Sequence, residues 1–468
     1  MAPMQQKKEL ISIVKCEKIL SCDMGECVLK DEKPFKDGGQ GALFHVTIDG
    51  NRYVMKLHIP KYCDRFLEGH IKSVIAKKPT PAINFAWPLS FVEAEVDYLE
   101  NGIYKSGKSI GYIMELVSNE YKDINDAIEA TEFYQNDRLK LCINICRAYR
   151  QLHECQYSYK DINRQNVMFH PKTLQVKIID NDNITINGEQ ITTRGIVEGT
   201  REYKAPEIVD RRMRCANIKA DLHSLAVLLF QILFIEHPLH GKRFLYNDFS
   251  EKELYSSEHA CFIFKDKNNL DKYIEISQSA HQTAKETWEA YPKSIKDMFY
   301  KVFVDCLDNP NARPSSDDWT EALVKALSRY YDYNCPKCGI SEGYRFYDDE
   351  KKGDLSCEGC GAQLLNPYMA SIHKNRRAID NITALYDKKV VYSCYIDPDP
   401  YNIDKDLFTP IFIAHVDKKG QLCLESCQNN TLKCDEQIIQ KGEKSPYITS
   451  ETKIQIGDYR CRIKGKNL

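Results

Sequence analysis

Hydrophobic residues recur with two different periods along this chain. In GALFHVTIDGNRYVMKLHI (41–59), two strand-like runs flank Asp49-Gly50-Asn51, which is typical of a hairpin turn because such turns need positive φ angles. From residue 138 the period becomes helical, and RLKLCINICRAYRQLHE places on one face Leu141, Ile145, Ala148 and Leu152. The segment DDWTEALVKALSRYY (317–331) has the same helical period. The pattern predicts a small β-rich lobe followed by a larger helical lobe.

The pattern changes again at YYDYNCPKCG (330–339), where a cysteine-rich stretch begins. Beyond it, alternating segments such as PIFIAHVDKKGQLCLES and KIQIGDYRCRIKG predict strands. The expected fold class is α+β, with four parts: a β-rich lobe over 1–117, a helical lobe over 118–330, a cysteine-rich module over 331–368 and a β-sandwich-like module over 369–468.

Composition and charge narrow the class of protein. Of 468 residues, 65 are Lys or Arg and 67 are Asp or Glu, so bulk electrostatics argue against a polyanion-binding protein. The longest apolar run, SLAVLLFQILFI (224–235), is too short to span a bilayer, and the first residues lack the pattern of a secretory signal. With 19 scattered cysteines and no export signal, reduced thiols are expected. We therefore expect a cytoplasmic protein with no membrane partner.

Glycines and a lysine in the β-rich lobe predict a phosphate-binding site. Gly39, Gly41 and Val46 are expected to bind the nucleotide. Glycine lets backbone N–H groups approach phosphate oxygens that a Cβ would keep away. Phe44 stands where a third glycine is usual in such loops. Lys56 ends the next strand, ten residues after Val46, and is expected to bind the α- and β-phosphates of ATP. A plain hairpin and a solvated lysine are the alternatives.

GYIMELV (111–117) predicts a strand that ends in a hinge. Main-chain groups of Glu115 and Val117 are expected to pair with the adenine edge, with Met114 packed behind it. A buried strand without a ligand fits the same letters.

A candidate magnesium site follows a second apolar run. VKIID (176–180) ends in Asp180, fourteen residues after Asn166. A carboxylate at the end of a buried strand is costly unless it binds a cation, and Mg²⁺ prefers hard oxygen ligands and bridges phosphates. We expect Asn166 and Asp180 to hold Mg²⁺.

GTREYKAPE (199–207), together with Asp221 and Arg313, completes a series of motifs in a diagnostic order. Residues 35–330 resemble a eukaryotic-type Ser/Thr protein kinase, and the resemblance implies a bilobal protein-kinase fold. It implies that Glu207 and Arg313 form a structural ion pair and that Asp221 anchors the catalytic loop.

The resemblance also assigns the chemistry. It implies that Asp161 meets the substrate hydroxyl, that Asn166 and Asp180 bind Mg²⁺, and that Lys56 binds the phosphates. Phosphoryl transfer needs mainly positioning and charge neutralisation, and all four groups are present. An active Ser/Thr kinase, autophosphorylation included, is the favoured hypothesis.

The catalytic loop YSYKDINRQNVMF (157–169) departs from the family pattern. Tyr159 stands in place of His, Lys160 in place of Arg, and Asn163 in place of Lys, which removes a cation near the transferring phosphate. Asp180-Asn181-Asp182 replaces the usual D-F-G. A pseudokinase scaffold therefore stays an alternative. A small-molecule kinase is a second one, although GTREYKAPE resembles a segment that holds peptide substrates.

Two finer assignments concern regulation. Glu68 is the sole glutamate of KYCDRFLEGHIKSVIA (61–76), the helix expected to supply an ion-pair partner for Lys56; a solvated helix charge is the alternative. Thr192 and Thr193 are candidate phosphosites between Asp180 and Ala205, and ordinary solvated threonines are the alternative.

CPKCG and CEGCG form two C-x-x-C knuckles, with the four candidate zinc ligands Cys335, Cys338, Cys357 and Cys360. The spacing resembles a structural zinc ribbon, with no open position for catalysis; two disulfides or a redox site are the alternatives. Acidic residues outnumber basic ones between the knuckles, so nucleic-acid binding is not expected.

The last part of the chain resembles a forkhead-associated module in the order of its strands, although it lacks the Gly-Arg and Ser-x-x-His signatures of phosphothreonine readers. Together with AWPL (86–89) and the zinc ribbon, the chain resembles bacterial eukaryotic-like kinases. For some of these, the resemblance implies partnership with a von Willebrand A-domain protein and a PP2C-type phosphatase. The C-terminal modules are expected to bind partners or regulate the kinase.

Overall fold

A computed structural model describes most of the chain, in the following ranges: 11–79, 84–129, 133–188, 199–213, 215, 217–245, 251–265, 280–335, 337–339, 341–347, 356–357, 359–374, 377–396 and 405–465. The chain forms two compact units. The first comprises Met1–Glu129, Ala148–Leu228 and Phe249–Ala260, and the second comprises Ala130–Arg147, Leu229–Asp248 and Cys261–Leu468.

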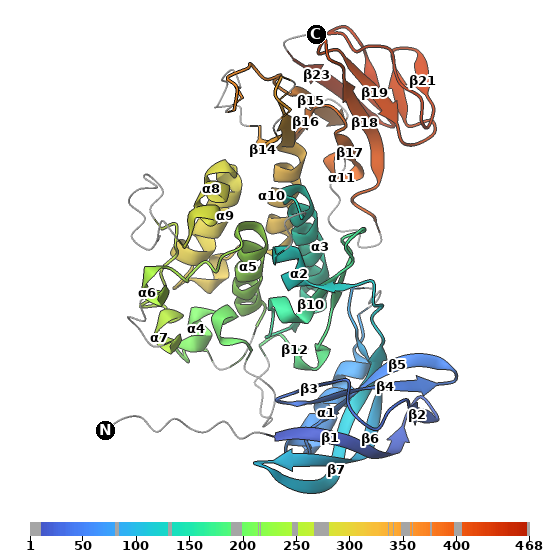
Figure 1. Ribbon diagram of the computed structural model, residues 1–468, viewed down its shortest axis with the longest axis vertical. Helices are drawn as coiled ribbons and strands as arrows, with labels where there is room; N and C mark the ends of the chain where they lie inside the picture. Colours follow the sequence, from blue (N-terminus) through green and yellow to red (C-terminus); the bar gives the residue numbers. More distant parts are fainter. Residues whose placement is uncertain are drawn as a thin grey trace. The chain divides into compact units, whose positions relative to one another are not determined.

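An antiparallel seven-stranded sheet forms the N-terminal part of the first unit (Figure 1). Its strands are β1 (Ile11–Cys22), β2 (Cys27–Leu29), β3 (Lys36–Gly38), β4 (Gly41–Ile48), β5 (Asn51–His58), β6 (Pro88–Glu100) and β7 (Ile103–Glu115), in the order β1-β6-β7-β5-β4-β2, with β3 on β4. Asp49 and Gly50 have φ angles of 49° and 76°, and Ile48 pairs with Asn51. The predicted hairpin is thus confirmed.

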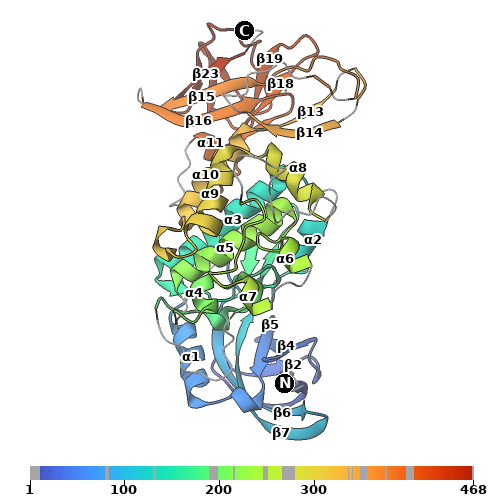
Figure 2. The ribbon, with the colours of Figure 1, turned by 90° about the vertical axis from the view of Figure 1, so that its left-hand side faces the viewer.

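The two faces of this sheet are buried differently. One face holds a core of side chains from five strands, among them Ile13, Phe44, Val46, Met55 and Val92. The other face is covered by helix α1 (Arg65–Ala76), which lies alongside the strands in Figure 2. Asp64 begins α1 by accepting hydrogen bonds from the N–H groups of Phe66 and Leu67, at 3.0 and 2.8 Å.

The rest of the first unit builds short elements around the catalytic loop. The strands are β8 (Lys122–Asp123), β9 (Tyr157–Ser158), β10 (Val167–Phe169), β11 (Val176–Ile178) and β12 (Thr185–Ile186), and they pair as β11-β10-β8 and β12-β9. Two 3₁₀ turns, Arg164–Asn166 and Asn181–Asn183, follow the residues expected to carry the chemistry. The helices are α2 (Ile124–Glu129), α4 (Pro206–Val209) and α7 (Glu251–Leu254).

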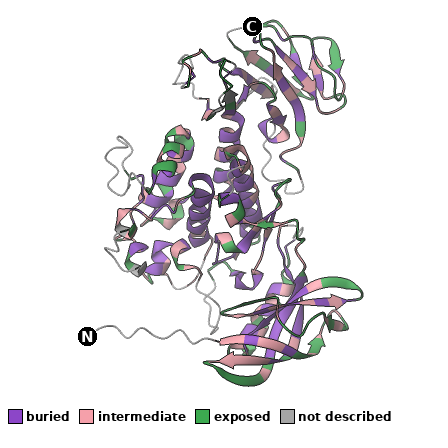
Figure 3. Cartoon of the chain, in the orientation of Figure 1, coloured by how far each residue is buried: buried purple, intermediate pink, exposed green. Residues whose placement is uncertain are grey.

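The longer helices confirm the helical periods of the sequence. Helix α3 (Gln135–Glu154) contains the predicted segment, and α5 (Ile218–Phe234) contains most of the apolar run. The residues of this run that lie in α5 are buried (Figure 3). Helix α10 (Ser316–Arg329) ends two residues before the predicted limit because the chain turns into strand β13 (Tyr330–Asn334). Over the residues described, no helix is both long and apolar enough to cross a membrane.

Aromatic side chains make up the core of the helical part of the second unit. Phe264 stacks on Trp288 of α8 (Gln282–Ala290), with ring centroids 4.4 Å apart. Phe299 of α9 (Lys293–Tyr300) meets Phe230 edge-on at 5.2 Å and Trp319 at 4.7 Å. The remaining helix of this part is α6 (Lys242–Leu245).

Strands dominate the second unit after α10. β13 pairs with β14 (Ser341–Phe346). A six-stranded antiparallel sheet has the order β16 (Arg377–Leu385), β15 (Tyr368–Lys374), β23 (Tyr459–Lys464), β22 (Ile454–Ile456), β20 (Leu432–Cys434), β21 (Gln437–Ile439). A three-stranded sheet has the order β17 (Val390–Tyr392), β18 (Pro410–Val416), β19 (Leu422–Ser426). The short helix α11 (Ser393–Ile396) follows β17. The forkhead-associated-like identity of this part stays a prediction.

Candidate active site

The carboxylate of Asp161 is held on both of its oxygens. Thr200 donates to Oδ1 from its backbone N–H at 2.7 Å and from its hydroxyl at 2.8 Å. Asn166 donates to Oδ2 at 3.1 Å and to the Asp161 carbonyl at 3.0 Å. Asp161 and Asn166, five residues apart in the sequence, therefore lie side by side in a fixed geometry.

The backbone of the catalytic loop is fixed from helix α5. Asp221 accepts hydrogen bonds from the backbone N–H groups of Tyr159 and Lys160 at 2.7 and 3.0 Å. His153 lies 3.2 Å from the same carboxylate. Lys160 has a φ angle of 66°, so the loop turns sharply just before Asp161. Asp221, 1% exposed, thus sets the path of the chain through the site.

Two of the altered residues make specific contacts. Tyr159 is fully buried, and its hydroxyl donates to the carbonyl of Ile179, so it ties the catalytic loop to the segment that carries Asp180. Asn163 donates to the hydroxyl of Thr200 at 3.0 Å and caps the following 3₁₀ turn by accepting from the N–H of Gln165 at 2.8 Å. These side chains stabilise the loop through neutral hydrogen bonds.

Asn166 directly precedes strand β10, and Asp180 follows its partner strand β11. Ile179, next to Asp180, donates its N–H to the carbonyl of Asn166 at 2.9 Å. The side chain of Asp180 is 30% exposed, and the backbone at this residue is left-handed, with a φ angle of 62°. Its neighbour Asn181 is fully buried and donates to the carbonyls of Ala86 and Ile178, at 2.8 and 2.9 Å. Asn181 stands at the position of the usual Phe, and hydrogen bonds replace the apolar packing of that residue.

Lys56 contacts two acidic residues of this segment. Its ammonium group donates to Asp180 and lies 2.9 and 3.0 Å from the two carboxylate oxygens of Asp182. Tyr112 donates to Asp182 at 3.0 Å, and His58 Nε2 lies 3.4 Å from it. Burial alone would lower the pKa of Lys56, but the charges of Asp180 and Asp182 outweigh it and raise that pKa.

The expected ion pair between Lys56 and Glu68 is corrected by the structure. Glu68 accepts from Lys72, one turn later on α1, at 2.6 Å, and both side chains are largely exposed. The buried face of α1 carries Leu67, Ile71 and Val74, so Glu68 points away from the sheet. The alternative of a solvated helix charge describes this residue.

The glycine-rich segment is a tight hairpin. Gly38 pairs with Gly41, which leaves Gly39 and Gln40 at the tip between β3 and β4. A Cβ on Gly41 would lie 2.1 Å from the carbonyl oxygen of Leu57, so this position requires glycine. At Gly39 a Cβ would meet nothing within 4 Å.

Val46, expected to bind the nucleotide, does not lie on the face of the sheet that carries Lys56. Val46 pairs with Tyr53 and lies in the core on the far face of the sheet, beside Phe44. Leu43 pairs directly with Lys56, and cross-strand partners share a face, so Leu43 stands on the side of the lysine.

The residues expected near the adenine lie together. Met114 packs in one cluster with Val54 and Val117, and Leu43 borders it. Glu115 ends β7 with an exposed side chain that lies 3.4 Å from Lys177. This cluster lies on the face of the sheet that carries Lys56.

The remaining predicted residues stand as follows. Glu207 and Arg313 are buried, at 3% and 4% exposure, one in each unit, and their ion pair stays a prediction. Thr192 and Thr193 fall outside the described residues.

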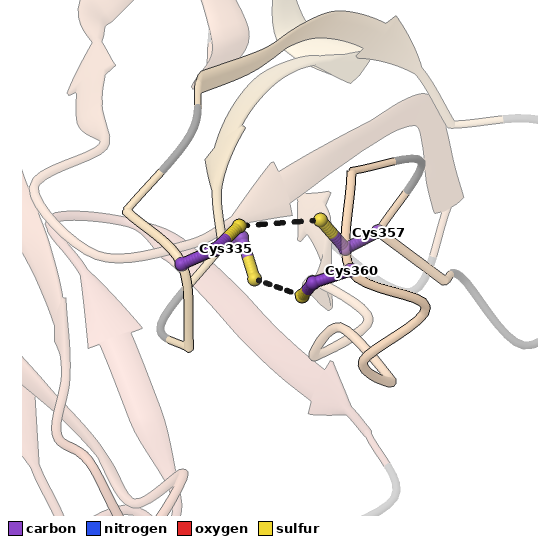
Figure 4. A group of neighbouring side chains, drawn as sticks. Cys335, Cys357 and Cys360 are labelled. Carbon is purple, nitrogen blue, oxygen red and sulfur yellow. Dashed lines mark hydrogen bonds between the residues drawn. The ribbon is translucent and has the colours of Figure 1, made fainter.

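The four cysteines of the knuckles converge in the second unit (Figure 4). Their sulfur atoms all lie within 4.8 Å of one another, with Cys335 and Cys360 at 3.5 Å and Cys338 and Cys357 at 3.6 Å. Tetrahedral zinc with bonds of about 2.3 Å sets sulfur atoms about 3.8 Å apart, so the group fits this ion. Backbone N–H groups, that of Cys338 foremost, lower the pKa of Cys335 to about 6, which favours the ligating thiolate.

Three residues of the site were not singled out from the sequence: Thr200, Asp182 and Leu43. Thr200 stood inside the quoted GTREYKAPE segment, and Asp182 inside D-N-D, so both carried a signal in their motif. Leu43 carried one only through its position relative to Lys56 in the hairpin.

Comparisons with known proteins show what the sequence is similar to. The family model described as protein kinase domain matches residues 100–324. The chain is 28% identical over 170 residues to calmodulin-binding receptor-like cytoplasmic kinase 3 of Arabidopsis thaliana, covering 32% of each chain. It is 24% identical over 204 residues to the serine/threonine-protein kinase Nek1 of Mus musculus, covering 42% of this chain and 16% of that protein. The chain thus spans a third or less of the length of these relatives. Residues 100–324 are thus similar to a protein kinase domain, and these two relatives are kinases of plant and animal origin.

Proposed function

We propose that this protein is an ATP- and Mg²⁺-dependent kinase that transfers the γ-phosphate to Ser or Thr of proteins, its own chain included. The observation that carries the proposal is the position of Asp161. Its carboxylate is fixed by Thr200 and Asn166, within a loop tied through Tyr159 to the segment of Asp180.

The donors in this region fit Mg²⁺ and the phosphates of ATP. Asn166 and the partly exposed Asp180 offer hard oxygen atoms beside the paired strands β10 and β11, which is the donor set that Mg²⁺ prefers. Bound Mg²⁺ neutralises phosphate charge during transfer. Lys56 would bind the phosphates, and Asp161 would orient the substrate hydroxyl and accept its proton. The hairpin tip at Gly39 leaves room for close approach of its backbone.

A protein substrate is supported by the segment that begins at Gly199. A Cβ on Gly199 would lie 2.4 Å from the carbonyl oxygen of Lys160, and Thr200 is bonded to Asp161. The chain that the family uses to hold peptides therefore begins in direct contact with the proposed base. This arrangement weighs against the small-molecule kinase.

The decisive experiment follows labelled γ-phosphate from Mg·ATP into protein, with wild type beside Asp161→Ala and Asp180→Ala. Glu68→Gln serves as the matched acidic control because Glu68 stands on the exposed face of α1. Label on Ser or Thr that is lost in both alanine variants and kept in the control supports the kinase. ATP binding without transfer in the presence of candidate substrates would favour the pseudokinase scaffold instead.

For the rest of the chain we propose a structural zinc ion on Cys335, Cys338, Cys357 and Cys360, and C-terminal modules over 331–368 and 369–468 that bind partners or regulate the kinase. The nineteen cysteines are all free of disulfides, which supports a reducing, cytoplasmic setting. A PP2C-type phosphatase and a von Willebrand A-domain protein stay candidate partners on the resemblance alone.

A further inference from the structure

Three polar side chains of the sheet converge on the carboxylate of Asp182. Lys56 on β5 and Tyr112 on β7 are directly paired across the strands, so they project side by side from one face. Both donate to Asp182 Oδ1, at 2.9 and 3.0 Å, and His58 lies 3.4 Å from Oδ2. Both oxygen atoms of this carboxylate thus face side chains of the sheet.

Asp180 and Asp182 differ in their access to solvent. The side chain of Asp180 is 30% exposed, whereas that of Asp182 is 6% exposed. A carboxylate this deeply buried is stable as an anion only when a cation and hydrogen-bond donors surround it. Asp182 has both, so its charge is committed to Lys56, while Asp180 can exchange its contact with Lys56 for a metal ion.

Helix α1 contacts the Asp182 segment through a histidine and not through Glu68. His70 Nε2 lies 2.7 Å from the backbone carbonyl of Asp182. Glu68, two residues earlier, pairs with Lys72 in solvent. The helix therefore contacts the backbone of the segment that carries Asp182, and the segment contacts the lysine.

We propose that Asp182 is the positioning residue for Lys56, in the role that a helical glutamate was expected to fill, so that the lysine is held by the segment that also supplies the metal ligand Asp180. This inference rests on the proposed function. If Asp182 holds Lys56, the positions of Lys56 and of the metal ligand Asp180 are coupled through one segment. Helix α1 contacts that segment through His70.

The test compares Asp182→Asn with the matched control Glu68→Gln in the full-length protein. Affinities for Mg·ATP and for adenosine, which lacks phosphates, are measured by calorimetry, and kcat and KM by labelled transfer. In Asp182→Asn we expect ATP affinity to fall about tenfold or more, since a charge-assisted contact is lost, with adenosine affinity nearly unchanged and kcat reduced. The Tm should fall as well, because Lys56 loses a buried partner. Glu68→Gln should match wild type in every readout.

A double-mutant cycle separates positioning from general damage. Once Lys56→Met has removed the ammonium group, adding Asp182→Asn should weaken ATP binding no further. Tyr112→Phe, which removes one donor to Asp182, should give a smaller loss in the same direction. Additive losses in the cycle, equal losses for adenosine and ATP, or a loss in Glu68→Gln equal to that in Asp182→Asn would each overturn the inference.

Two further outcomes separate this inference from the proposed function. If Mn²⁺ binding, followed by paramagnetic resonance, is lost in Asp182→Asn as fully as in Asp180→Ala, Asp182 is a metal ligand and the inference is wrong. If wild-type protein binds neither ATP nor adenosine, the kinase proposal fails with it; if it binds both and Asp182→Asn does likewise, only the inference fails.

Discussion

Thr200 and Asp161 are joined by two hydrogen bonds to a single oxygen atom, 2.7 Å from the backbone N–H and 2.8 Å from the hydroxyl. The hydroxyl also accepts from Asn163 at 3.0 Å. Since 39 residues separate Thr200 from Asp161, the contact couples the substrate-side segment to the proposed base.

Replacing Thr200 by Val removes the hydroxyl and keeps the shape of the side chain. Because a hydrogen bond to a charged group contributes about 1.5–3 kcal/mol, we expect kcat to fall about tenfold to a hundredfold. Initial rates of phosphate transfer measure the effect. Thr200→Ser keeps the hydroxyl and should stay within about threefold of wild type; equal rates for Val and wild type would contradict the coupling.

Gly41→Ala should destabilise the sheet of the first unit. The new methyl group would meet the Leu57 carbonyl at 2.1 Å, so the strands must separate, at a cost of at least about 2 kcal/mol. Thermal unfolding measures it as a lowered Tm. Gly39→Ala, at the open tip of the same hairpin, is the control and should unfold like wild type. A normal Tm in Gly41→Ala would show that β4 and β5 lie further apart than described.

Cys357→Ser should abolish zinc binding. The thiolate is one of four converging sulfur atoms, and a site with three sulfur ligands loses most of the affinity of a closed structural site. Metal analysis of purified protein should find about one zinc per chain in wild type and almost none in the variant. Cys423→Ser, on β19 and outside the group, should keep the metal. Zinc retained in Cys357→Ser would contradict the proposal that the four cysteines bind the metal.

Lys389 should make stability depend on pH. Burial lowers its pKa from 10.5 to about 7. Between these values the unfolded chain binds the proton and the folded chain does not, so this residue makes stability rise with pH, by up to about 1.4 kcal/mol per unit.

Lys389→Met should remove this contribution. Between pH 7 and pH 9, the Tm of wild type should therefore rise relative to the Tm of the variant. Lys388→Met, at the exposed neighbouring position, should follow wild type. Parallel pH profiles for Lys389→Met and wild type would refute the prediction.

The sequence predicted the strands of the first unit better than it predicted which side of them meets the nucleotide. Alternation has a period of two, so an error of one position in aligning the glycine hairpin moves an assignment to the opposite face. The predicted turn Asp49-Gly50-Asn51 is one residue longer than the observed one, because Ile48 pairs with Asn51, and this register sets Leu43 rather than Val46 on the face of Lys56.

The position of Glu68 could have been predicted. Leu67, Ile71 and Val74 mark the buried face of the helix, and a residue directly after Leu67 lies about 100° away from it. The partner of Lys56 could not: Asp182 is 126 residues distant, and nothing local in either segment reports that a buried strand and a 3₁₀ turn will meet. Lys56 contacts both Asp180 and Asp182, and only the folded structure shows that the Asp182 side chain is the more deeply buried of the two.

Lys389 has a consequence for the limits of the catalytic part. Its ammonium group donates to the carbonyls of Leu327 and Tyr330, at 3.2 and 2.9 Å, where helix α10 ends. Tyr395 donates to the same Leu327 carbonyl at 3.3 Å. The end of helix α10 is thus completed by donors encoded sixty or more residues later. A protein truncated after residue 330 would lack these donors, so we expect α10 to depend on the C-terminal region for a stable end.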